Sequence, residues 1–377
     1  MIIGCSIFVV EQPVIKTNDM AYPIGCEEMY NTIVIGAGQA GLAMGYYLKH
    51  SDHSFLILDE NQEVGEVWGR RYDSLVLFTP RSFSSLPGLE LKGNPQGFPA
   101  KDEILHYLKL YADTFELPIK HNTRVTNVRK ENNIYHISTE HAEYETRNVI
   151  VATGPFQKPR IPTFTNTLSQ GIVQLHSSEY LNPSQLKEGN VLVVGGGNSG
   201  AQIAAEISRG GKTYLSTSQR LMFLPLVIKN KSVFWWFDKV GILKATSKSF
   251  IGKLIQKRGD PIFGLELKYA IQNGDVVIKN RSIDGQGNKV TFQDNTFLDV
   301  HNIIWATGFT MDYSWLNVSG VLDFEGKPIH DRGITNSRGL YFLGLPWQYR
   351  RGSALLQGVG DDAEHLIKHI QQMRFDF

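Results

Sequence analysis

A glycine-rich turn between a strand and a helix occurs twice in this chain of 377 residues. The first turn reads Gly36-Ala37-Gly38-Gln39-Ala40-Gly41 and follows the apolar run 32–35. In such a turn the first glycine allows a tight bend, the second lets a pyrophosphate approach the backbone, and the third lets the helix pack on the strand. The N–H groups at the helix start then face the phosphates. The sequence therefore predicts a dinucleotide-binding unit at residues 32–50.

An acidic residue ends the strand that follows this helix. Residues 55–58 read Phe-Leu-Ile-Leu, and Asp59 comes directly after them. A carboxylate at this place can accept hydrogen bonds from an adenosine ribose. The strand, the glycine-rich turn, the helix and the acidic residue therefore follow one another with the order and spacing expected for cofactor binding.

The pattern returns as Gly195-Gly196-Gly197-Asn198-Ser199-Gly200, between an apolar run and an alanine-rich helix. The next strand ends in Ser216-Thr217-Ser218-Gln219-Arg220, and no carboxylate takes the place of Asp59. Hydroxyls and Arg220 can hold a 2′-phosphate that an acid would repel. This favours NADPH over NADH, which stays possible, although Arg220 on a solvated loop is the alternative. The candidate NAD(P)H contacts are Gly195, Gly197, Asn198, Ser199, Gly200, Ser218, Gln219 and Arg220.

Two strand ends are near copies of each other. Ala152-Thr153-Gly154 follows the run 149–151, and Ala306-Thr307-Gly308 follows the run 303–305. Such small-residue turns suit a chain crossover close to a bound dinucleotide. Two dinucleotide folds in one chain fit a flavoenzyme in which a nicotinamide delivers hydride to FAD.

The predicted fold class is α/β, with two Rossmann-like dinucleotide-binding domains and the smaller NAD(P)H domain inserted in a discontinuous FAD domain. The expected parts are an N-terminal extension (1–28), an FAD domain (29–155 plus 310–377) and an NAD(P)H domain (156–309) with a helical insertion (221–274). The insertion combines aromatic residues with lysines, which would suit a substrate lid or a membrane-surface contact. An internal helical pair or a dimer surface is favoured, because most apolar stripes are core.

Composition narrows the class of protein. Hydrophobic residues make up 42% of the chain and charged residues 20%, which is typical of a globular protein, and the net charge of +1 gives no support for a nucleic-acid partner. The two cysteines, Cys5 and Cys26, have neither CxxC nor metal-ligand spacing. We therefore expect no disulfide framework and no metal site, and a reducing cytoplasm is the default compartment. No apolar run is long enough for a transmembrane segment.

With these motifs, the sequence resembles the flavin-containing monooxygenase family, in particular its short bacterial members, over roughly residues 29–370. The resemblance also includes residues 65–68, 71–75, 78–80 and 85–88. It places this stretch beside the flavin, although Trp68 and Tyr72 would also suit a protein core. The further FAD candidates are Trp68, Arg71, Tyr72, Thr79 and Val125, with Gly344, Leu356 and Gln357 near the C-terminus.

The identifying motif of that family is only partly present. His176 and Tyr180 match it, but one extra residue separates Gly171 from His176, and Ser169 stands where a Phe is expected. This departure leaves the subgroup, and hence the substrate, open. We interpret His176 as a structural residue that ties the interdomain linker, because no acid partner for it can be identified.

The resemblance implies that NADPH reduces FAD, that the reduced flavin adds O₂ at C4a, and that the (hydro)peroxide oxygenates a small sulfide, amine or ketone. No side chain is expected to be catalytic. Phe78 and Thr79 stand where many members place an Asn near the isoalloxazine. The expected partners are a small-molecule substrate and O₂, and a homodimer is left open. The alternatives are a flavin-dependent reductase passing electrons to a quinone or protein acceptor, and an accessory nucleotide-binding protein of a transport system.

Overall fold

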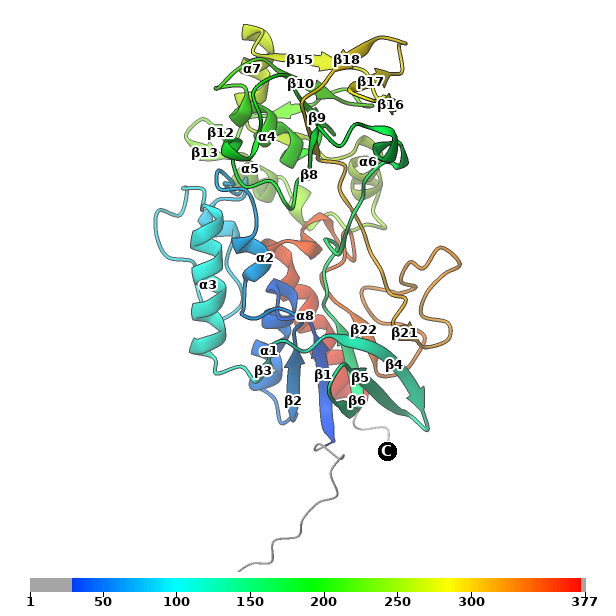
Figure 1. Ribbon diagram of the computed structural model, residues 1–377. Coiled ribbons are helices and arrows are strands. Elements are labelled where there is room, and N and C mark those ends of the chain that lie inside the picture. Colours follow the sequence, from blue (N-terminus) through cyan, green and yellow to red (C-terminus); the bar gives the residue numbers. More distant parts are fainter. Residues whose placement is uncertain (1–28, 374–377) are drawn as a thin grey trace, which may run out of the picture.

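The computed structural model describes residues 29–373 and shows two α/β halves stacked end to end (Figure 1). The predicted extension at residues 1–28 lies outside the described residues. In the described part of the chain, no helix is both long and apolar enough to cross a membrane. The two halves each contain a parallel β-sheet, so the predicted α/β class with two Rossmann-like folds is confirmed.

The lower half contains an eight-stranded sheet in the order β21-β4-β5-β6-β1-β2-β3, with β22 also paired to β6. Its strands are β1 (Tyr30–Ile35), β2 (Phe55–Leu58), β3 (Ile119–Lys120), β4 (Val125–Glu131), β5 (Ile134–Thr139), β6 (Glu143–Val151), β21 (Leu316–Asn317) and β22 (Leu340–Phe342). Strands β1, β2, β3, β6 and β22 form the parallel part, and β4–β5–β6 form an antiparallel meander. The sheet combines residues from both ends of the described chain, which supports the proposed discontinuous domain.

Helices pack on this sheet because β1 and β2 are apolar on both faces. They are α1 (Gln39–Lys49), α2 (Glu66–Gly69), α3 (Lys101–Thr114) and α8 (Leu356–Gln372). One apolar cluster joins α1, α3 and α8 through buried residues such as Leu42, Leu108 and Leu366. In Figure 1, α1 and α8 lie side by side next to the parallel strands.

The upper half contains a five-stranded parallel sheet in the order β15-β10-β9-β19-β8. Its strands are β8 (Val173–His176), β9 (Val191–Val194), β10 (Thr213–Ser216), β15 (Val276–Lys279) and β19 (Asn302–Trp305). Helices α4 (Asn198–Ile207) and α7 (Glu266–Asn273) share an apolar cluster with it. An antiparallel sheet of β16 (Ser282–Gln286), β17 (Lys289–Phe292) and β18 (Phe297–Asp299) lies beside it.

The insertion predicted at 221–274 is helical only in part. Besides α5 (Val233–Lys239) and α6 (Phe250–Arg258), it contains the pairs β11 (Phe223–Leu224) with β14 (Ile262–Phe263) and β12 (Val227–Ile228) with β13 (Lys231–Ser232). Its last helix, α7, belongs to the core of the upper sheet, where Leu267 and Ala270 are buried. Short runs between turn residues, such as Lys229-Asn230 with positive φ, favour a hairpin over a helix.

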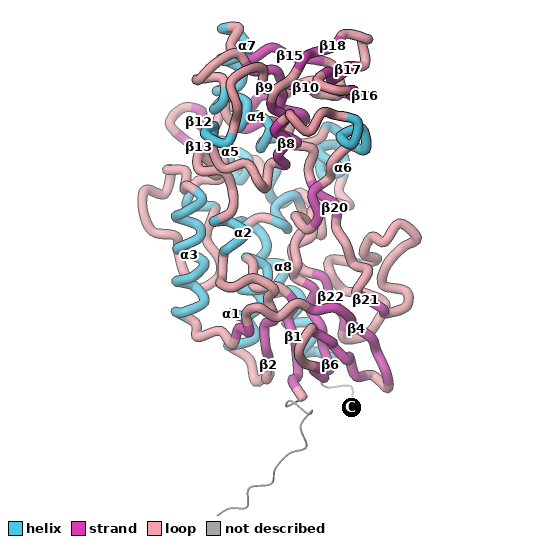
Figure 2. The backbone as a smooth tube through the Cα atoms, in the orientation of Figure 1, coloured by secondary structure: helices cyan, strands magenta, loops and turns pink. Residues whose placement is uncertain are grey.

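The chain passes between the halves through a short antiparallel ribbon of β7 (Lys158–Pro159) and β20 (Phe309–Thr310). Figure 2 shows β20 in the connection between the two halves. Because β7 follows β6 and β20 follows β19, both crossings start at the carboxyl end of a strand next to a glycine-rich turn. The ribbon therefore joins the two strand ends that lie next to the glycine-rich turns.

Candidate functional site

The first glycine-rich turn joins β1 to α1 and has little space on one side. Gly36 has a φ of +105°, and a Cβ there would lie 2.7 Å from the carbonyl oxygen of Ala152. A Cβ on Gly41 would lie 1.8 Å from the carbonyl oxygen of Gly36. In contrast, no atom lies within 4 Å of the position that a Cβ would take on Gly38. The turn is therefore closed toward the protein and open on the side where a phosphate would approach.

The second turn repeats this geometry. Gly195 has a φ of +118°, and a Cβ there would lie 2.2 Å from the carbonyl oxygen of Ala306. A Cβ on Gly200 would lie 2.0 Å from the carbonyl oxygen of Gly195, while the space at Gly197 is open. Thus each predicted Ala-Thr-Gly strand end lies directly against the first glycine of its own turn.

Neither helix start uses its N–H groups for a side-chain cap. The N-cap residues are Gly38 for α1 and Gly197 for α4, and neither first turn contains an acidic side chain. Helix starts leave several backbone donors without an intrahelical partner and carry partial positive charge. Together with the open glycines, both turns therefore fit the pyrophosphate of a dinucleotide.

Sheet register identifies the residue that corresponds to Asp59 in the upper half. The N–H of Gly36 donates to the carbonyl of Leu58, and the N–H of Gly195 donates to the carbonyl of Ser216. The residue after Ser216 is Thr217, so a hydroxyl takes the place of the buried carboxylate. The sequence indicates that no carboxylate ends this strand, but it does not single out Thr217, because only the register shows which residue of the loop matches Asp59.

The three residues predicted to hold a 2′-phosphate follow Thr217 on the surface. Ser218, Gln219 and Arg220 are exposed, and within residues 29–373 the guanidinium of Arg220 has no ion-pair partner. The preceding Thr217 donates its N–H to the carbonyl of Lys279, which ties the start of this loop to β15.

The side chain of Asn198, a predicted NAD(P)H contact, is hydrogen-bonded to the insertion. Its side-chain oxygen accepts a hydrogen bond from the N–H of Phe263 at 2.9 Å, and its amide donates to the carbonyl of Pro261 at 3.1 Å. Ser199 lies beside it in the first turn of α4, partly buried. The Asn198 side chain therefore fastens the second turn to the end of the insertion.

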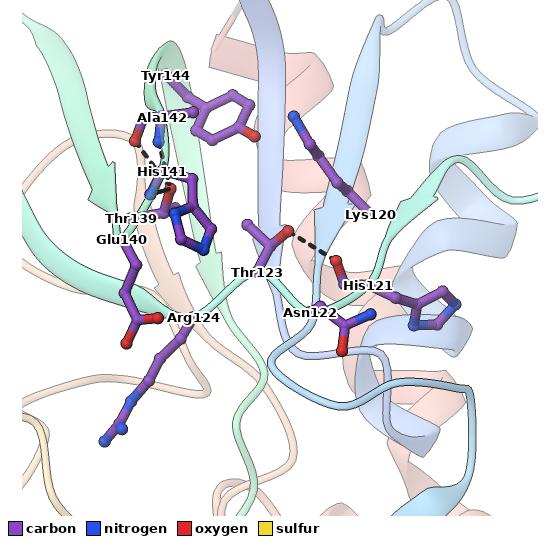
Figure 3. Close-up of a pocket in the computed structure, with 10 residues that line it drawn as sticks. All are labelled: Lys120, His121, Asn122, Thr123, Arg124, Thr139, Glu140, His141, Ala142 and Tyr144. Carbon is purple, nitrogen blue, oxygen red and sulfur yellow. Dashed lines mark hydrogen bonds between the residues drawn. The ribbon is translucent and has the colours of Figure 1, made fainter.

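A pocket of about 350 Å³ lies between the segment 120–124 and the segment 139–144 (Figure 3). Residues 120–124 form one wall, and the 139–144 segment forms the other. The first wall is hydrogen-bonded to the backbone of Asp59. The N–H of Asp59 donates to the carbonyl of Lys120, and the carbonyl of Asp59 accepts from the N–H of Thr123. Val125, the predicted FAD contact, is the next residue and begins β4. A second pocket, of about 620 Å³ between α3 and residues 89–92, is lined by none of the predicted residues.

Arg71 lies at the crossing between the halves. Its guanidinium is 4.9 Å from the ring centre of Phe156 and 5.3 Å from that of Phe309. Burial lowers its pKa, and within the described residues it has no carboxylate partner. Phe156 and Phe309 follow the two Ala-Thr-Gly turns, so Arg71 stands between both candidate sites.

His176 is buried at the same crossing. Its Nε2 lies 2.9 Å from the carbonyl oxygen of Gly308, its Nδ1 lies 2.8 Å from the Ser178 hydroxyl, and its ring packs edge-on against Phe309. Burial lowers its pKa. These contacts agree with a structural role in the linker. The Thr307 hydroxyl donates to the carbonyl of Arg160, and Gln157 donates to the Thr153 hydroxyl.

The side chains expected beside the flavin contact different parts of the protein. Trp68 is half-buried against the lower core, whereas Tyr72 is buried in the apolar cluster of the upper half and donates its hydroxyl to Gln202 at 2.8 Å. The Thr79 hydroxyl lies 2.9 Å from the Ser84 hydroxyl.

Phe78 stacks on the insertion. Its ring centre is 4.7 Å from that of Phe263 and 5.9 Å from that of Phe234. The guanidinium of Arg351 lies 5.2 Å from the Phe263 ring and donates to Asp260. The insertion and the C-terminal segment therefore meet over Phe78.

The predicted C-terminal residues meet the first turn. Gly344 lies close to Ala40, since a Cβ on Gly344 would be 2.8 Å from the Ala40 Cβ. Gln39 donates to the carbonyl of Ala354 at 2.7 Å, just before α8 begins at Leu356 and Gln357. The starts of helices α1 and α8 thus lie close together, and neither has an acidic first turn.

Comparison with known proteins shows the family and the fold to which this arrangement belongs. Residues 33–222 match the family model described as pyridine nucleotide-disulphide oxidoreductase. An oxidoreductase of unassigned activity from Bacillus subtilis, CzcO, is 56% identical over 91% of this chain and 99% of its own length. The structure of the flavin-containing monooxygenase from Stenotrophomonas maltophilia has a TM-score of 0.78 at 26% identity and covers 92% of this chain and 99% of that one. The structure of OTEMO in complex with FAD and NADP has a TM-score of 0.68 at 17% identity and covers 92% of this chain and 86% of that one. The chain therefore belongs to the pyridine nucleotide-disulphide oxidoreductase family, and its fold is that of the flavin-containing monooxygenases.

Proposed function

We propose that this oxidoreductase is an FAD-dependent, NAD(P)H-using monooxygenase that acts on a small sulfide, amine or ketone. The observation that carries the proposal is the repeated relation of Gly36 to Ala152 and of Gly195 to Ala306. This relation leaves both glycine-rich turns, here called the lower and the upper cradle, open to a phosphate, and one ribbon joins the strand ends beside them. An enzyme that uses two dinucleotide cofactors requires two such sites near each other. The fold likeness to a bacterial flavin-containing monooxygenase supports the same activity.

The lower cradle would hold FAD. Gly38 and the start of α1 would take the pyrophosphate, and the buried Asp59 would accept a ribose hydroxyl. The start of α8, which has no acidic first turn, would face the flavin end. When bound, FAD supplies the redox chemistry: it takes a hydride from the nicotinamide and, once reduced, activates O₂.

The upper cradle would hold NADP(H). Gly197 and the start of α4 would take the pyrophosphate, while Thr217 and the exposed Arg220 would accommodate the 2′-phosphate. Arg71, a desolvated cation between the two strand ends, would hold a phosphate of either cofactor. The Phe78–Phe263 stack would keep water from one side of the crossing between the halves.

The proposed reaction combines one substrate, one O₂, one NADPH and one proton to give one oxygenated product, one NADP⁺ and one water. The test is to incubate the purified holoprotein with NADPH, ¹⁸O₂ and thioanisole, and to compare NADPH consumed with H₂O₂ released and labelled sulfoxide formed. We expect label in the product, with amines and ketones tested in the same way. If NADPH oxidation is matched by H₂O₂ across all three substrate classes, or needs a quinone to proceed, the monooxygenase proposal fails and the chain is a reductase.

A further inference from the structure

Helix α6 presents apolar side chains to solvent. The exposed fractions are 83% for Phe250, 50% for Ile251 and 40% for Leu254. These three residues fall within about 100° of one another around the helix axis, given 3.6 residues per turn. On the opposite side, the buried Gly252 lies against the turn that leads into the helix, where a Cβ would lie 1.9 Å from the carbonyl oxygen of Thr246. The apolar stripe of the helix is therefore left uncovered.

Cations surround this stripe. Lys253, Lys257 and Arg258 are exposed on the same helix, and within residues 29–373 none of them has an ion-pair partner. By the same helical geometry, Lys253 and Lys257 flank the stripe on one side, and Arg258 continues the stripe at the C-terminal end of the helix. The face thus has an apolar centre, a cationic edge on one side and a cation at its end.

The imbalance extends over the whole insertion. Residues 221–274 contain three acids, Asp238, Asp260 and Glu266, and nine cations, whereas the full chain has a net charge of only +1. The cations are Lys229, Lys231, Lys239, Lys244, Lys248, Lys253, Lys257, Arg258 and Lys268. Asp260, two residues after α6, pairs with Arg351, and Asp331 pairs with Lys248, two residues before the helix.

We propose that α6 docks this protein on an anionic lipid surface. A short amphipathic helix with Phe, Ile and Leu at its centre and Lys or Arg at its edge can bury its apolar face at the headgroup boundary while the cations meet lipid phosphates. Long lysine side chains can also extend away from the apolar stripe toward the headgroups. The charge of α6 is complementary to an anionic bilayer, and burial of its apolar stripe adds a hydrophobic contribution to the electrostatic attraction.

A reversible attachment is expected, because the apolar contact is small. Each cation near an anionic surface strengthens binding about fivefold. Raising the salt concentration from about 0.05 M to about 0.5 M should release the protein, since the screening length falls well below the size of the face. The inference concerns α6 alone and does not depend on the proposed reaction.

The test is co-sedimentation of the full-length holoprotein with sucrose-loaded vesicles, either pure phosphatidylcholine or phosphatidylcholine containing about 25% phosphatidylglycerol. We expect salt-sensitive binding to the anionic vesicles only. The variants Phe250→Ser/Leu254→Ser and Lys253→Gln/Lys257→Gln should each lower the bound-to-free ratio at least tenfold. All four residues are exposed, so flavin content and thermal midpoint should remain unchanged.

Phe324 provides a matched control. Its exposed fraction of 96% exceeds that of Phe250, but it lies between Asp323 and Glu325. Phe324→Ser should bind vesicles like the natural chain. The proposal is overturned if the anionic vesicles bind no protein at low salt, or if the α6 variants bind as well as the Phe324 control. It is also overturned if those variants instead convert a dimer to a monomer in gel filtration, because the face would then be a subunit interface.

Discussion

The N–H of Ala37 donates a hydrogen bond to a carboxylate oxygen of Asp59 at 2.5 Å. The other oxygen of Asp59 accepts from the N–H and the side-chain amide of Asn61, both at 2.8 Å. These three donors fix the carboxylate against the first turn. A carboxylate has about four acceptor sites, so one remains for a ribose hydroxyl.

Asp59→Asn should weaken FAD binding about 10- to 100-fold. Asn loses the charge and part of the acceptor capacity, and hydrogen bonds to charged groups contribute about 1.5–3 kcal/mol. The measurement is the dissociation constant of FAD for the apoprotein, followed by flavin fluorescence. Glu60→Gln is the control, because Glu60 is the next residue but is exposed. Equal FAD affinity of the two variants would argue against a ribose contact of Asp59.

Thr217→Asp should shift the nucleotide preference from NADPH toward NADH. The substitution restores in the upper half the carboxylate that Asp59 supplies in the lower one, and a carboxylate there accepts from a ribose 2′-hydroxyl but repels a 2′-phosphate. We expect the ratio of kcat/KM for NADPH over NADH to fall by roughly one to two orders of magnitude. Gln272→Asp, on the exposed face of α7, controls for the charge of the domain. An unchanged ratio would place the 2′-phosphate away from Thr217.

The fold could be predicted because its determinants are local. A strand, a turn and a helix leave a continuous pattern in the sequence, and the two Ala-Thr-Gly repeats sit at strand ends that pair with β1 and β9. Thr217 could not be predicted, because its match to Asp59 depends on the register between β9 and β10.

The directions of individual side chains could not be predicted from the sequence either. Tyr72 and Arg71 are neighbours, yet Tyr72 enters the core of the upper half and Arg71 lies between Phe156 and Phe309. No periodicity of the segment distinguishes the two, since both contacts come from residues more than 80 positions away. Likewise, the place of Asn198 in the turn predicts a nucleotide contact but not its bond to Phe263, which depends on the folding of the insertion.

Arg71→Met should leave thermal stability unchanged or raise it, while weakening dinucleotide binding. Met keeps the contact with Phe156 and Phe309 and removes a cation whose pKa burial lowers, so folding no longer has to desolvate a charge. A guanidinium bound to phosphate contributes strong charge-assisted hydrogen bonds, and their loss should cost about tenfold or more in affinity. The measurements are the thermal midpoint and the dissociation constants of FAD and NADPH.

The control for Arg71 is the neighbouring cation. Arg70→Met removes an exposed charge that pairs with Glu66 on the same short helix, and it should change neither cofactor affinity. A large fall in thermal midpoint for Arg71→Met, with both affinities intact, would instead show that the cation only holds the crossing together.

Stability should fall as pH drops from 7.5 to 5.5. Burial lowers the pKa of His176, His330, His365 and His369 below the ordinary value of 6.5. Below pH 6.5 the unfolded chain therefore binds more protons than the folded one, so the stability present above pH 6.5 is lost progressively toward the folded-state pKa values. The carboxylates with lowered pKa, such as Asp312, act at lower pH.

His176→Gln tests this pH dependence. The glutamine amide can still donate to the carbonyl of Gly308, but it does not titrate, so the loss of thermal midpoint between pH 7.5 and 5.5 should be smaller than in the natural chain. Glu179 and Arg71 act on His176 with opposite effects on its pKa: Glu179 raises it and Arg71 lowers it. His106→Gln, on an exposed part of α3, should retain the full pH dependence. A slope in His176→Gln equal to that of the natural chain would assign the effect to the other three histidines.

Alanine at the second glycine of each turn should separate cofactor binding from folding. Gly38 and Gly197 have φ values of −73° and −78°, which any residue adopts, and nothing lies within 4 Å of the added Cβ. Gly38→Ala and Gly197→Ala should therefore fold normally. However, each methyl group would point into the space proposed for a pyrophosphate, so Gly38→Ala should lose FAD, whereas Gly197→Ala should retain FAD and lose NADPH-driven reduction. Gly195→Ala is the contrasting variant, because its Cβ would meet the Ala306 carbonyl at 2.2 Å on a backbone with φ of +118°, and it should fold poorly. Flavin absorbance, thermal midpoint and anaerobic reduction by NADPH distinguish the three. Retention of FAD by a well-folded Gly38→Ala would mean that the flavin cofactor does not bind at the first turn.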